Sequence, residues 1–194
     1  MNIAQSYEAS LLMLLPDEVA LEIDLRNHRA MNPTQTAVTK GYASAAGEGE
    51  RIWIVGDTMT LKATSEGTAG KLVLLENLTA PDGGPPPHIH TNEDEFFFVL
   101  DGAFEIRIGD ELNEVGPGGF AYVPRGTVHN FRNTADTPSR ILVGFTPGGM
   151  EGFFRASGRP ATDDGPAPPL DEEEIARTTA AAPTYGVEAV AFDD

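Results

Sequence analysis

The sequence predicts an all-β protein of the jelly-roll type, in which two sheets pack face to face. Short apolar segments follow one another between residues 51 and 146, and turn-forming glycines separate them. No long segment with helical periodicity interrupts this succession. Many short strands joined by glycine-rich turns are typical of a double-sheet jelly roll.

The first 50 residues are expected to form an N-terminal arm that carries a short helix. Residues 6–15 end in the run LLMLL before Pro16, which favours a short amphipathic helix. The run has no Lys or Arg ahead of it and is too short for a signal sequence or a membrane span. A cytoplasmic location is therefore expected. Residues 42–50, rich in Gly, Ala, Ser and Glu, are expected to be a loop.

A succession of strands is expected from residue 51 onward. The predicted strands are residues 51–55, 59–63, 71–76, 95–100, 103–108, 120–123, 129–133 and 140–146. Within residues 104–108 apolar and charged side chains alternate, as they do in a half-buried strand. The proline-rich residues 81–87 form neither a helix nor a sheet ladder, so we expect an extended segment there.

The pattern changes after Pro147, where short helical extensions are expected. Residues 150–155 are expected to form a helical turn, and residues 160–169 resemble a linker. The acidic residues 171–174 are typical of a helix N-terminus, and residues 185–190 are expected to be a final strand or a docking segment. The expected organisation is an N-terminal arm with a short helix (1–50), a β-barrel with the metal site (51–148) and a C-terminal helical segment and tail that pack on the barrel (149–194).

The composition argues against several functional classes. The chain of 194 residues has a formal net charge of −17 and no cysteine. The negative charge argues against partners such as nucleic acid or an anionic membrane surface. The absence of cysteine excludes disulfides, thiolate metal ligands and cysteine nucleophiles. The chain has no P-loop, no dinucleotide-binding glycine motif and no serine in a nucleophile elbow.

Three of the four histidines lie in two short blocks whose spacing indicates a mononuclear metal site. The first block has the pattern HxHx4Ex6G and contains His88, His90 and Glu95; the second has the pattern Gx5PxGx2Hx3N and contains His129. Histidines two apart on a strand point to the same face, and the polar residues 91–94 are expected to form a bend that brings Glu95 back towards them. Imidazole and carboxylate groups bind divalent iron, manganese, cobalt, nickel and zinc. Two such blocks favour a metal site over ordinary polar strand residues.

These two blocks resemble the two motifs of the cupin superfamily. All spacings within the blocks fit, and only the glycine ahead of the first histidine is displaced, with Gly83 and Gly84 as candidates. The resemblance implies a double-stranded β-helix barrel that holds one divalent metal ion per chain. The absence of an internal repeat indicates a single barrel. The ligands implied by the resemblance are His88, His90, Glu95 and His129.

Further features are similar to single-domain cupins related to bacterial quercetin 2,3-dioxygenase. They are Gly56-Asp57 ahead of the barrel strands, the segments TPGG, EGFF and GRPA between residues 146 and 161, an acidic helix and a final YGVE segment. This resemblance implies a metal-dependent dioxygenase that cleaves a flavonol or a related aromatic enol with O2. Glu95 is the candidate catalytic residue, because it can either bind the metal or accept a substrate proton. A homodimer is also implied, with the leucines of residues 11–15 as a candidate contact.

Aromatic side chains near the two blocks predict a substrate pocket for a flat organic ligand. The expected pocket residues are Phe97, Tyr122, Phe131, Phe153 and Phe154. Arg107 and Arg125 are candidates for orienting an anionic substrate. Two other functions stay open, because a fold supports many functions. One is a non-redox isomerase or cyclase acting on a polyketide or a sugar, and the other is a small-molecule-binding protein without turnover.

Overall fold

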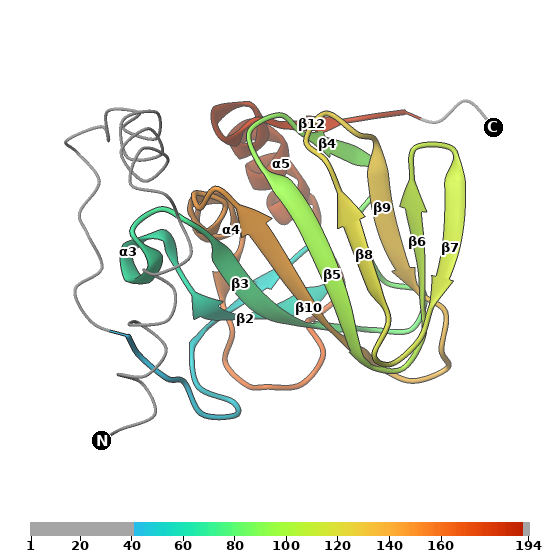
Figure 1. Cartoon of the computed structure of the whole chain (residues 1–194), viewed down its shortest axis with the longest axis horizontal. Coiled ribbons are helices and arrows are strands. Elements are labelled where there is room, and N and C mark those ends of the chain that lie inside the picture. Colours follow the sequence, from blue (N-terminus) through green and yellow to red (C-terminus); the bar gives the residue numbers. More distant parts are fainter. Residues whose placement is uncertain (1–40, 192–194) are drawn as a thin grey trace, which may run out of the picture. The chain divides into compact units, whose positions relative to one another are not determined.

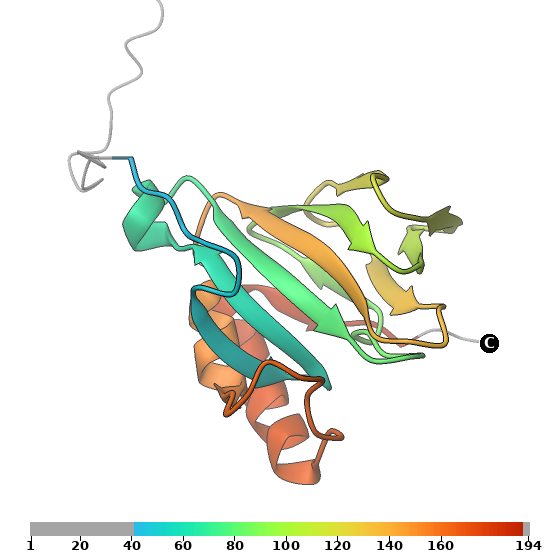
Figure 2. The same cartoon turned by 90° about the horizontal axis from the view of Figure 1, so that it is seen from below.

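The computed structural model describes residues 41–191, which form two antiparallel β-sheets and four short helices (Figures 1 and 2). This is the predicted jelly-roll arrangement, although the two sheets are not hydrogen-bonded to each other into a closed barrel. The helix expected at residues 6–15 and the leucines within it lie outside the described residues. None of the helices among residues 41–191 is long and apolar enough to cross a membrane.

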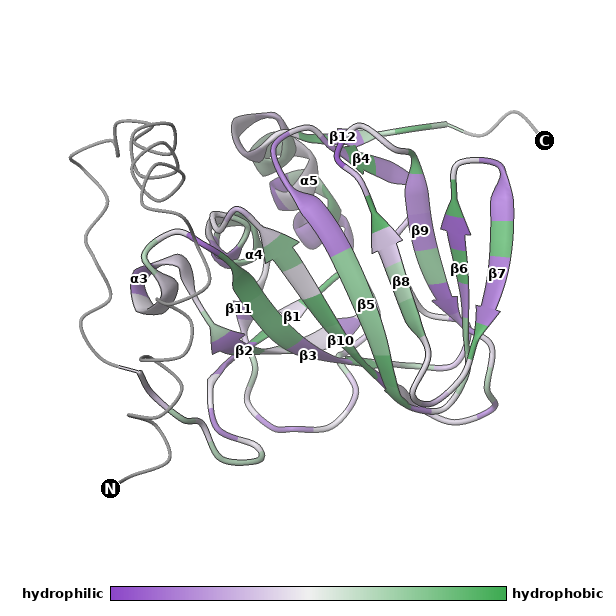
Figure 3. Ribbon diagram, viewed as in Figure 1, coloured by the Kyte–Doolittle hydropathy of each residue, from purple (hydrophilic) through white to green (hydrophobic). Residues whose placement is uncertain are grey.

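The larger sheet has seven strands in the order β11-β1-β2-β3-β10-β5-β8. Their bounds are β1 (Glu50–Ile54), β2 (Asp57–Ala63), β3 (Val73–Thr79), β5 (Asp94–Asp101), β8 (Phe120–Val123), β10 (Ser139–Thr146) and β11 (Arg159–Pro160). Its central strands β3, β10 and β5 are largely hydrophobic (Figure 3). Along β3 buried and half-buried residues alternate, because every second side chain points towards the second sheet.

The smaller sheet has five strands in the order β12-β4-β9-β6-β7. Their bounds are β4 (His88–His90), β6 (Phe104–Ile108), β7 (Glu111–Val115), β9 (His129–Asn133) and β12 (Val187–Ala189). The core lies between the two sheets, where the ring of Phe97 on β5 is 5.7 Å from the ring of Phe131 on β9.

Most expected strands are present, and the differences concern weakly patterned segments. The expected list omitted β7, whose residues are mainly exposed and therefore show no burial period, and the two-residue strand β11. Residues 65–68, between two of the expected strands, form the helix α3 (Ser65–Thr68). The side chain of the preceding residue, Thr64, caps this helix by accepting a hydrogen bond from the backbone N–H of Gly67. The strand expected at residues 71–76 is shifted to Val73–Thr79.

The C-terminal segment returns to both sheets. After β10 come the helices α4 (Glu151–Ser157), α5 (Glu172–Ala181) and η1 (Ala182–Tyr185). Asp171 caps α5, because its carboxylate accepts a hydrogen bond from the backbone N–H of Glu174 at 2.8 Å. Strand β11 pairs with β1 and strand β12 pairs with β4, so the segment covers one side of the sheets (Figure 2).

Candidate metal centre

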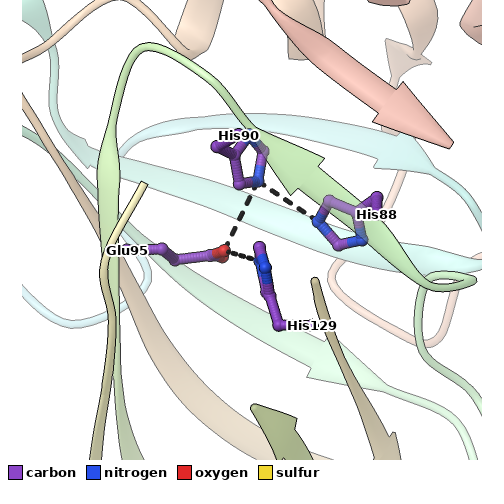
Figure 4. Close-up of side chains that lie close together, drawn as sticks. All are labelled: His88, His90, Glu95 and His129. Atoms are coloured by element: carbon purple, nitrogen blue, oxygen red, sulfur yellow. Dashed lines mark hydrogen bonds and ion pairs between the residues drawn. The ribbon is translucent and has the colours of Figure 1, made fainter. Parts of the chain in front are cut away.

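Four side chains from three strands converge at one place between the two sheets (Figure 4). His88 and His90 come from β4, His129 comes from β9, and Glu95 comes from β5. One ligand atom of each residue lies within 4.8 Å of those of the other three. His88 and His129 are opposite each other in the register of β4 and β9, whereas Glu95 reaches across from the larger sheet. The cluster therefore forms only when the two sheets pack together.

A bend between β4 and β5 brings Glu95 towards the histidines. Residues 91–93 belong to neither strand, and they carry the chain from the smaller sheet to the larger one. The bend expected from the polar residues is confirmed. The start of β5 is held by Asp94, whose carboxylate accepts hydrogen bonds from the backbone N–H of Arg125 at 3.0 Å and from its Nε at 2.9 Å.

A backbone hydrogen bond from Gly126 joins the loop of the second motif to the strand of the first motif. Gly126 has a φ of 80°, a conformation that other residues rarely adopt, and its N–H donates to the carbonyl of His90 at 2.8 Å. The backbone bond joins the loop before His129 directly to the end of β4. The glycine within the second motif therefore has a structural role in aligning the two blocks.

Backbone carbonyls orient two of the imidazole rings. Nδ1 of His88 lies 2.8 Å from the carbonyl oxygen of Pro86, and Nδ1 of His129 lies 2.9 Å from that of Thr127. Because a carbonyl only accepts, each Nδ1 must carry the hydrogen. In the neutral ring the lone pair is then on Nε2, which points into the cluster.

The ligand atoms of the four side chains are mainly hydrogen-bond acceptors, and they lie close to one another. Nε2 of His88 lies 3.2 Å from Nε2 of His90, which is 3.4 Å from Oε2 of Glu95. Nε2 of His129 lies 2.5 Å from the same carboxylate oxygen. Lone pairs this close need a proton or a metal ion between them. Three imidazole nitrogens and one carboxylate oxygen are a donor set that fits a divalent metal.

The ionisation of the cluster also suits a metal ion. Burial opposes ionisation of Glu95, but hydrogen bonds to His129 and His90 hold the pKa of its carboxyl well below the usual range. Burial, reinforced by the charge on His129, lowers the pKa of His88 to about 4, so its ring is neutral at pH 7. Burial acts in the same direction on His129, but the bond to Glu95 outweighs it and raises the pKa of that ring. A neutral imidazole and an ionised carboxylate are the forms that bind metal, so His88 and Glu95 are in the binding form, whereas His129 must give up its proton before it binds.

A cavity of about 670 Å³ opens onto this cluster. His88, His90 and Glu95 form part of its wall. The remaining wall is mainly apolar and comes from the larger sheet, α4 and the C-terminal segment, with Ile54, Met59, Leu75, Val143, Ile175 and Val187 among its residues. The volume lies in the range of cavities that bind small organic molecules.

The expected pocket residues divide into two groups. Phe131, Phe153 and Phe154 line the cavity. Phe97 is 1% exposed and packs in the core behind Phe131, outside the cavity wall. Tyr122 is 47% exposed, because its neighbours Ala121 and Val123 are the residues of β8 that point inward.

The two candidate arginines also lie away from the cavity wall. Arg125 forms an exposed ion pair with Asp94 at 2.9 Å. The expected list also missed parts of the wall, namely Asp57 and the later part of the C-terminal segment, between residues 170 and 189. The parity of β2 could have indicated Asp57, because it shares a face with Met59 and Leu61.

Comparisons with known proteins agree with this fold and this cluster. Residues 78–145 match the cupin domain family. Quercetin 2,3-dioxygenase of Bacillus subtilis (strain 168) is 30% identical over 121 residues, which are 61% of this chain and 35% of that protein. Germin-like protein 5-1 of Oryza sativa subsp. japonica is 32% identical over 71 residues, which are 34% of this chain and 32% of that protein. The chain thus spans about a third of the length of each of these two relatives.

Two solved structures share the fold. KdgF from Halomonas sp. has a TM-score of 0.52 at 20% identity, over 58% of this chain and 98% of that one. An RmlC-like cupin from Shewanella frigidimarina NCIMB 400 has a TM-score of 0.50 at 15% identity, over 59% and 98% of the two chains. The fold and the cluster together define a jelly-roll protein with a possible metal centre between its sheets. Residues 78–145 match a cupin domain, and the fold of residues 41–191 agrees with that family.

Proposed function

We propose that this protein is a metal-dependent dioxygenase that cleaves a flavonol or a related aromatic enol with O2. The observation that carries the proposal is the position of the His–His–Glu–His cluster, which opens onto a large and mainly apolar cavity. The similarity to quercetin 2,3-dioxygenase of Bacillus subtilis supports the reaction class.

The four clustered side chains would hold one divalent ion of iron, manganese, cobalt, nickel or zinc. Such an ion supplies a Lewis acid for the oxygens of an enol and, when it is redox-active, a means of reacting with O2. The donor set is His88, His90, Glu95 and His129.

Glu95 is the side chain with a second role. It is ionised in the cluster and belongs to the cavity wall, so it can accept the proton of a substrate hydroxyl. Burial raises its basicity, whereas the hydrogen bonds to His129 and His90 lower it. Any movement of the carboxylate away from these two rings therefore makes it a stronger base.

The apolar wall would bind the rings of the substrate and exclude water. Phe131 on β9 and two phenylalanines of α4, Phe153 and Phe154, contribute aromatic surface. We assign to residues 150–155 the control of access to the cluster. These residues include the start of α4, which follows the last central strand.

The experiment is oxygen uptake with simultaneous loss of flavonol absorbance, after reconstitution with each metal in turn. We expect turnover with at least one of iron, manganese, cobalt and nickel. No turnover with any metal across a panel of flavonols would reject the dioxygenase. Conversion without oxygen uptake would instead support a non-redox isomerase or cyclase, and tight binding without turnover would support a binding protein.

Replacement of Glu95 by glutamine separates its two roles. The amide can stay near a metal ion but cannot take up a proton, so we expect Glu95→Gln to lower kcat by about 100-fold or more. Metal content, measured by elemental analysis on the same preparation, should be partly retained. A variant with unchanged kcat would show that Glu95 is only a structural ligand.

A further inference from the structure

A second carboxyl group lies in the cavity wall, on a different strand from the metal cluster. Asp57 is the first residue of β2 and is 1% exposed. It follows the two-residue turn Val55-Gly56, both with positive φ, and it lies opposite Thr79 on β3. The rest of the nearby wall is apolar, with Met59 and Leu75 on the same sheet.

Among residues 41–191, one oxygen of this carboxyl group has no hydrogen-bond partner. Nδ2 of Asn77 donates to Oδ2 of Asp57 at 2.8 Å and to Oγ1 of Thr79 at 3.0 Å. Oδ1 of Asp57 is buried and accepts nothing. A buried polar atom without a partner is costly, and such atoms are rare in folded proteins. A ligand in the cavity would remove this cost by supplying the missing hydrogen bond.

A second unpartnered polar atom belongs to the same wall. Oγ1 of Thr178 on α5 is buried without a partner, whereas the hydroxyl of its neighbour Thr179 donates to the carbonyl of Ile175 at 2.8 Å. Helix α5 is tied to the turn before Asp57, because a carboxylate oxygen of Glu174 accepts from the N–H of Val55 at 2.5 Å. Two residues of the cavity wall, Asp57 and Thr178, therefore carry buried unsatisfied polar atoms, and they lie on two elements that are directly joined.

The register of the sheets places Asp57 towards the end of the sheets remote from the metal cluster. His129 and Asn133 are the two ends of β9, and Nδ2 of Asn133 donates to the carbonyl of Thr79, the residue opposite Asp57. In the larger sheet Glu95 is opposite Phe145, which is opposite Val73 at the other end of β3 from Thr79. An elongated ligand with one end at the cluster would therefore extend towards Asp57.

The protonation of Asp57 indicates which group it recognises. Burial raises the pKa of its carboxyl to about 7, and the neighbouring polar side chains of Asn77 and Thr79 offset only part of this effect. Near neutral pH the group is present in both forms. A hydroxyl group on the ligand matches both, because it donates to the carboxylate and accepts from the carboxylic acid.

We propose that Asp57 and Thr178 form a polar subsite that recognises a hydroxyl group on the end of the ligand remote from the metal cluster. The identity of the other end of the ligand rests on the proposed dioxygenase function. A competing explanation is that Asp57 only joins β2 to β3 through Asn77 and Thr79. That explanation predicts changes in stability but none in ligand preference.

The test compares ligands that differ only at the remote end. The probes are 3-hydroxyflavone derivatives with a hydroxyl, methoxy or amino group at the 4′ position, titrated into zinc-loaded protein under nitrogen so that no turnover occurs. We expect the hydroxyl compound to bind about tenfold more tightly than the methoxy compound, which is the difference in Kd that one hydrogen bond produces.

Three variants test which residues cause the preference for the hydroxyl compound over the methoxy compound. Asp57→Asn keeps the shape and can still accept from Asn77, but its amide nitrogen only donates, so the preference should fall to about onefold. Thr178→Val should reduce it. Thr179→Val is the matched control and should leave the preference unchanged, because the Thr179 hydroxyl is already satisfied within α5. Circular dichroism confirms that each variant is folded, and Thr178→Val carries the test if Asp57→Asn does not fold.

A second pair of probes separates this inference from the proposed function. 4-Hydroxybiphenyl and 4-methoxybiphenyl lack chelating oxygens and do not depend on a metal. One outcome is that flavonols fail to bind, while the wild-type protein prefers 4-hydroxybiphenyl to 4-methoxybiphenyl and Asp57→Asn does not. In that case the dioxygenase proposal fails and the subsite stands. The subsite is overturned if neither variant changes the preference for the hydroxyl group, if the amino compound binds most tightly, or if no hydroxylated probe binds to the wild-type protein.

Discussion

At the scale of single residues, the protonation of each buried side chain follows from its nearest partner. His88 and His129 both donate Nδ1–H to a backbone carbonyl, yet their pKa values move in opposite directions. The difference is the short contact between His129 and Glu95. Backbone carbonyls thus fix the tautomers of His88 and His129, and the carboxylate of Glu95 determines the charge of His129. The cluster is thereby arranged to accept a cation.

The first prediction concerns the cluster histidines. His88→Ala and His129→Ala should each abolish stoichiometric metal binding, because the remaining ligands lose their chelate geometry. Elemental analysis of protein purified without chelator should give about one divalent ion per wild-type chain and far less in the variants. His28→Ala, at the histidine outside the two motifs, is the control. Full occupancy in the His88→Ala/His129→Ala double variant would contradict the assignment.

The second prediction concerns Asp57 and pH. Its pKa of about 7 in the folded protein is above the ordinary value of 3.8, so the folded state binds the proton more tightly than the unfolded state. The wild-type protein should therefore lose stability, relative to Asp57→Asn, as pH rises from 4 to 7. The expected slope is at most about 1.4 kcal/mol of unfolding free energy per pH unit.

Denaturant titrations of both proteins at pH 4, 5.5 and 7 measure this difference. Asp94→Asn is a contrasting variant, because hydrogen bonds from Arg125 hold the pKa of Asp94 well below its usual range. A difference between wild type and Asp57→Asn that stays constant over this interval would mean that Asp57 does not titrate there.

At the scale of elements, the C-terminal segment is a structural part of the cavity. Helix α4 is anchored by Glu151, which is buried and accepts hydrogen bonds from the backbone N–H of Ser65 at 2.7 Å and from its hydroxyl at 3.0 Å. The ring of Phe154 packs 5.7 Å from that of Phe145 on β10. The phenylalanines of α4 that line the cavity are thus held on a fixed helix.

The third prediction concerns this helix. Replacing Phe153 and Phe154 by alanine should weaken flavonol binding about tenfold or more, while metal content stays near one ion per chain. The reason is that both rings line the cavity but neither belongs to the cluster. The measurements are titration of the ligand and elemental analysis on the same sample. If metal content and melting temperature collapse while affinity in the remaining folded protein is unchanged, the two rings only cap the core.

At the scale of the whole molecule, the cluster connects the two sheets. Glu95 belongs to the seven-stranded sheet, and the three histidines belong to the five-stranded sheet. A bound ion would therefore act as a link between sheets that share no backbone hydrogen-bonded strand pair. The homodimer and the cytoplasmic location expected from the sequence stay predictions.

The fourth prediction follows from this link. Because a metal that binds only the folded state stabilises it, EDTA should lower the melting temperature, by an amount equivalent to about 2.7 kcal/mol when free metal is at 100 times its Kd. Adding back the metal should restore it. The His88→Ala/His129→Ala variant should melt at the same temperature with and without EDTA. An unchanged wild-type melting temperature would argue against a metal that joins the sheets.

The sequence by itself determined the strand succession and the four clustered residues. Strand parity and turn residues act locally, so strands β8 and β9 have the predicted bounds. The spacing of His88, His90 and Glu95 around a polar bend is also a local property of one segment. Patterns of this kind can be recognised without knowing the partner strands. Strand β7 could not be predicted in this way, because a mainly exposed strand has no burial period.

Only the tertiary structure decided what surrounds the cluster. The C-terminal strand β12 lies beside β4, with Val187 opposite His90, although about a hundred residues separate them in the chain. Parity also could not show that Phe97 points into the closed core while Phe131 reaches the cavity. The physical reason is that periodicity defines which face of a strand is buried, whereas the neighbour that covers this face depends on how the sheets and helices pack over distant parts of the chain.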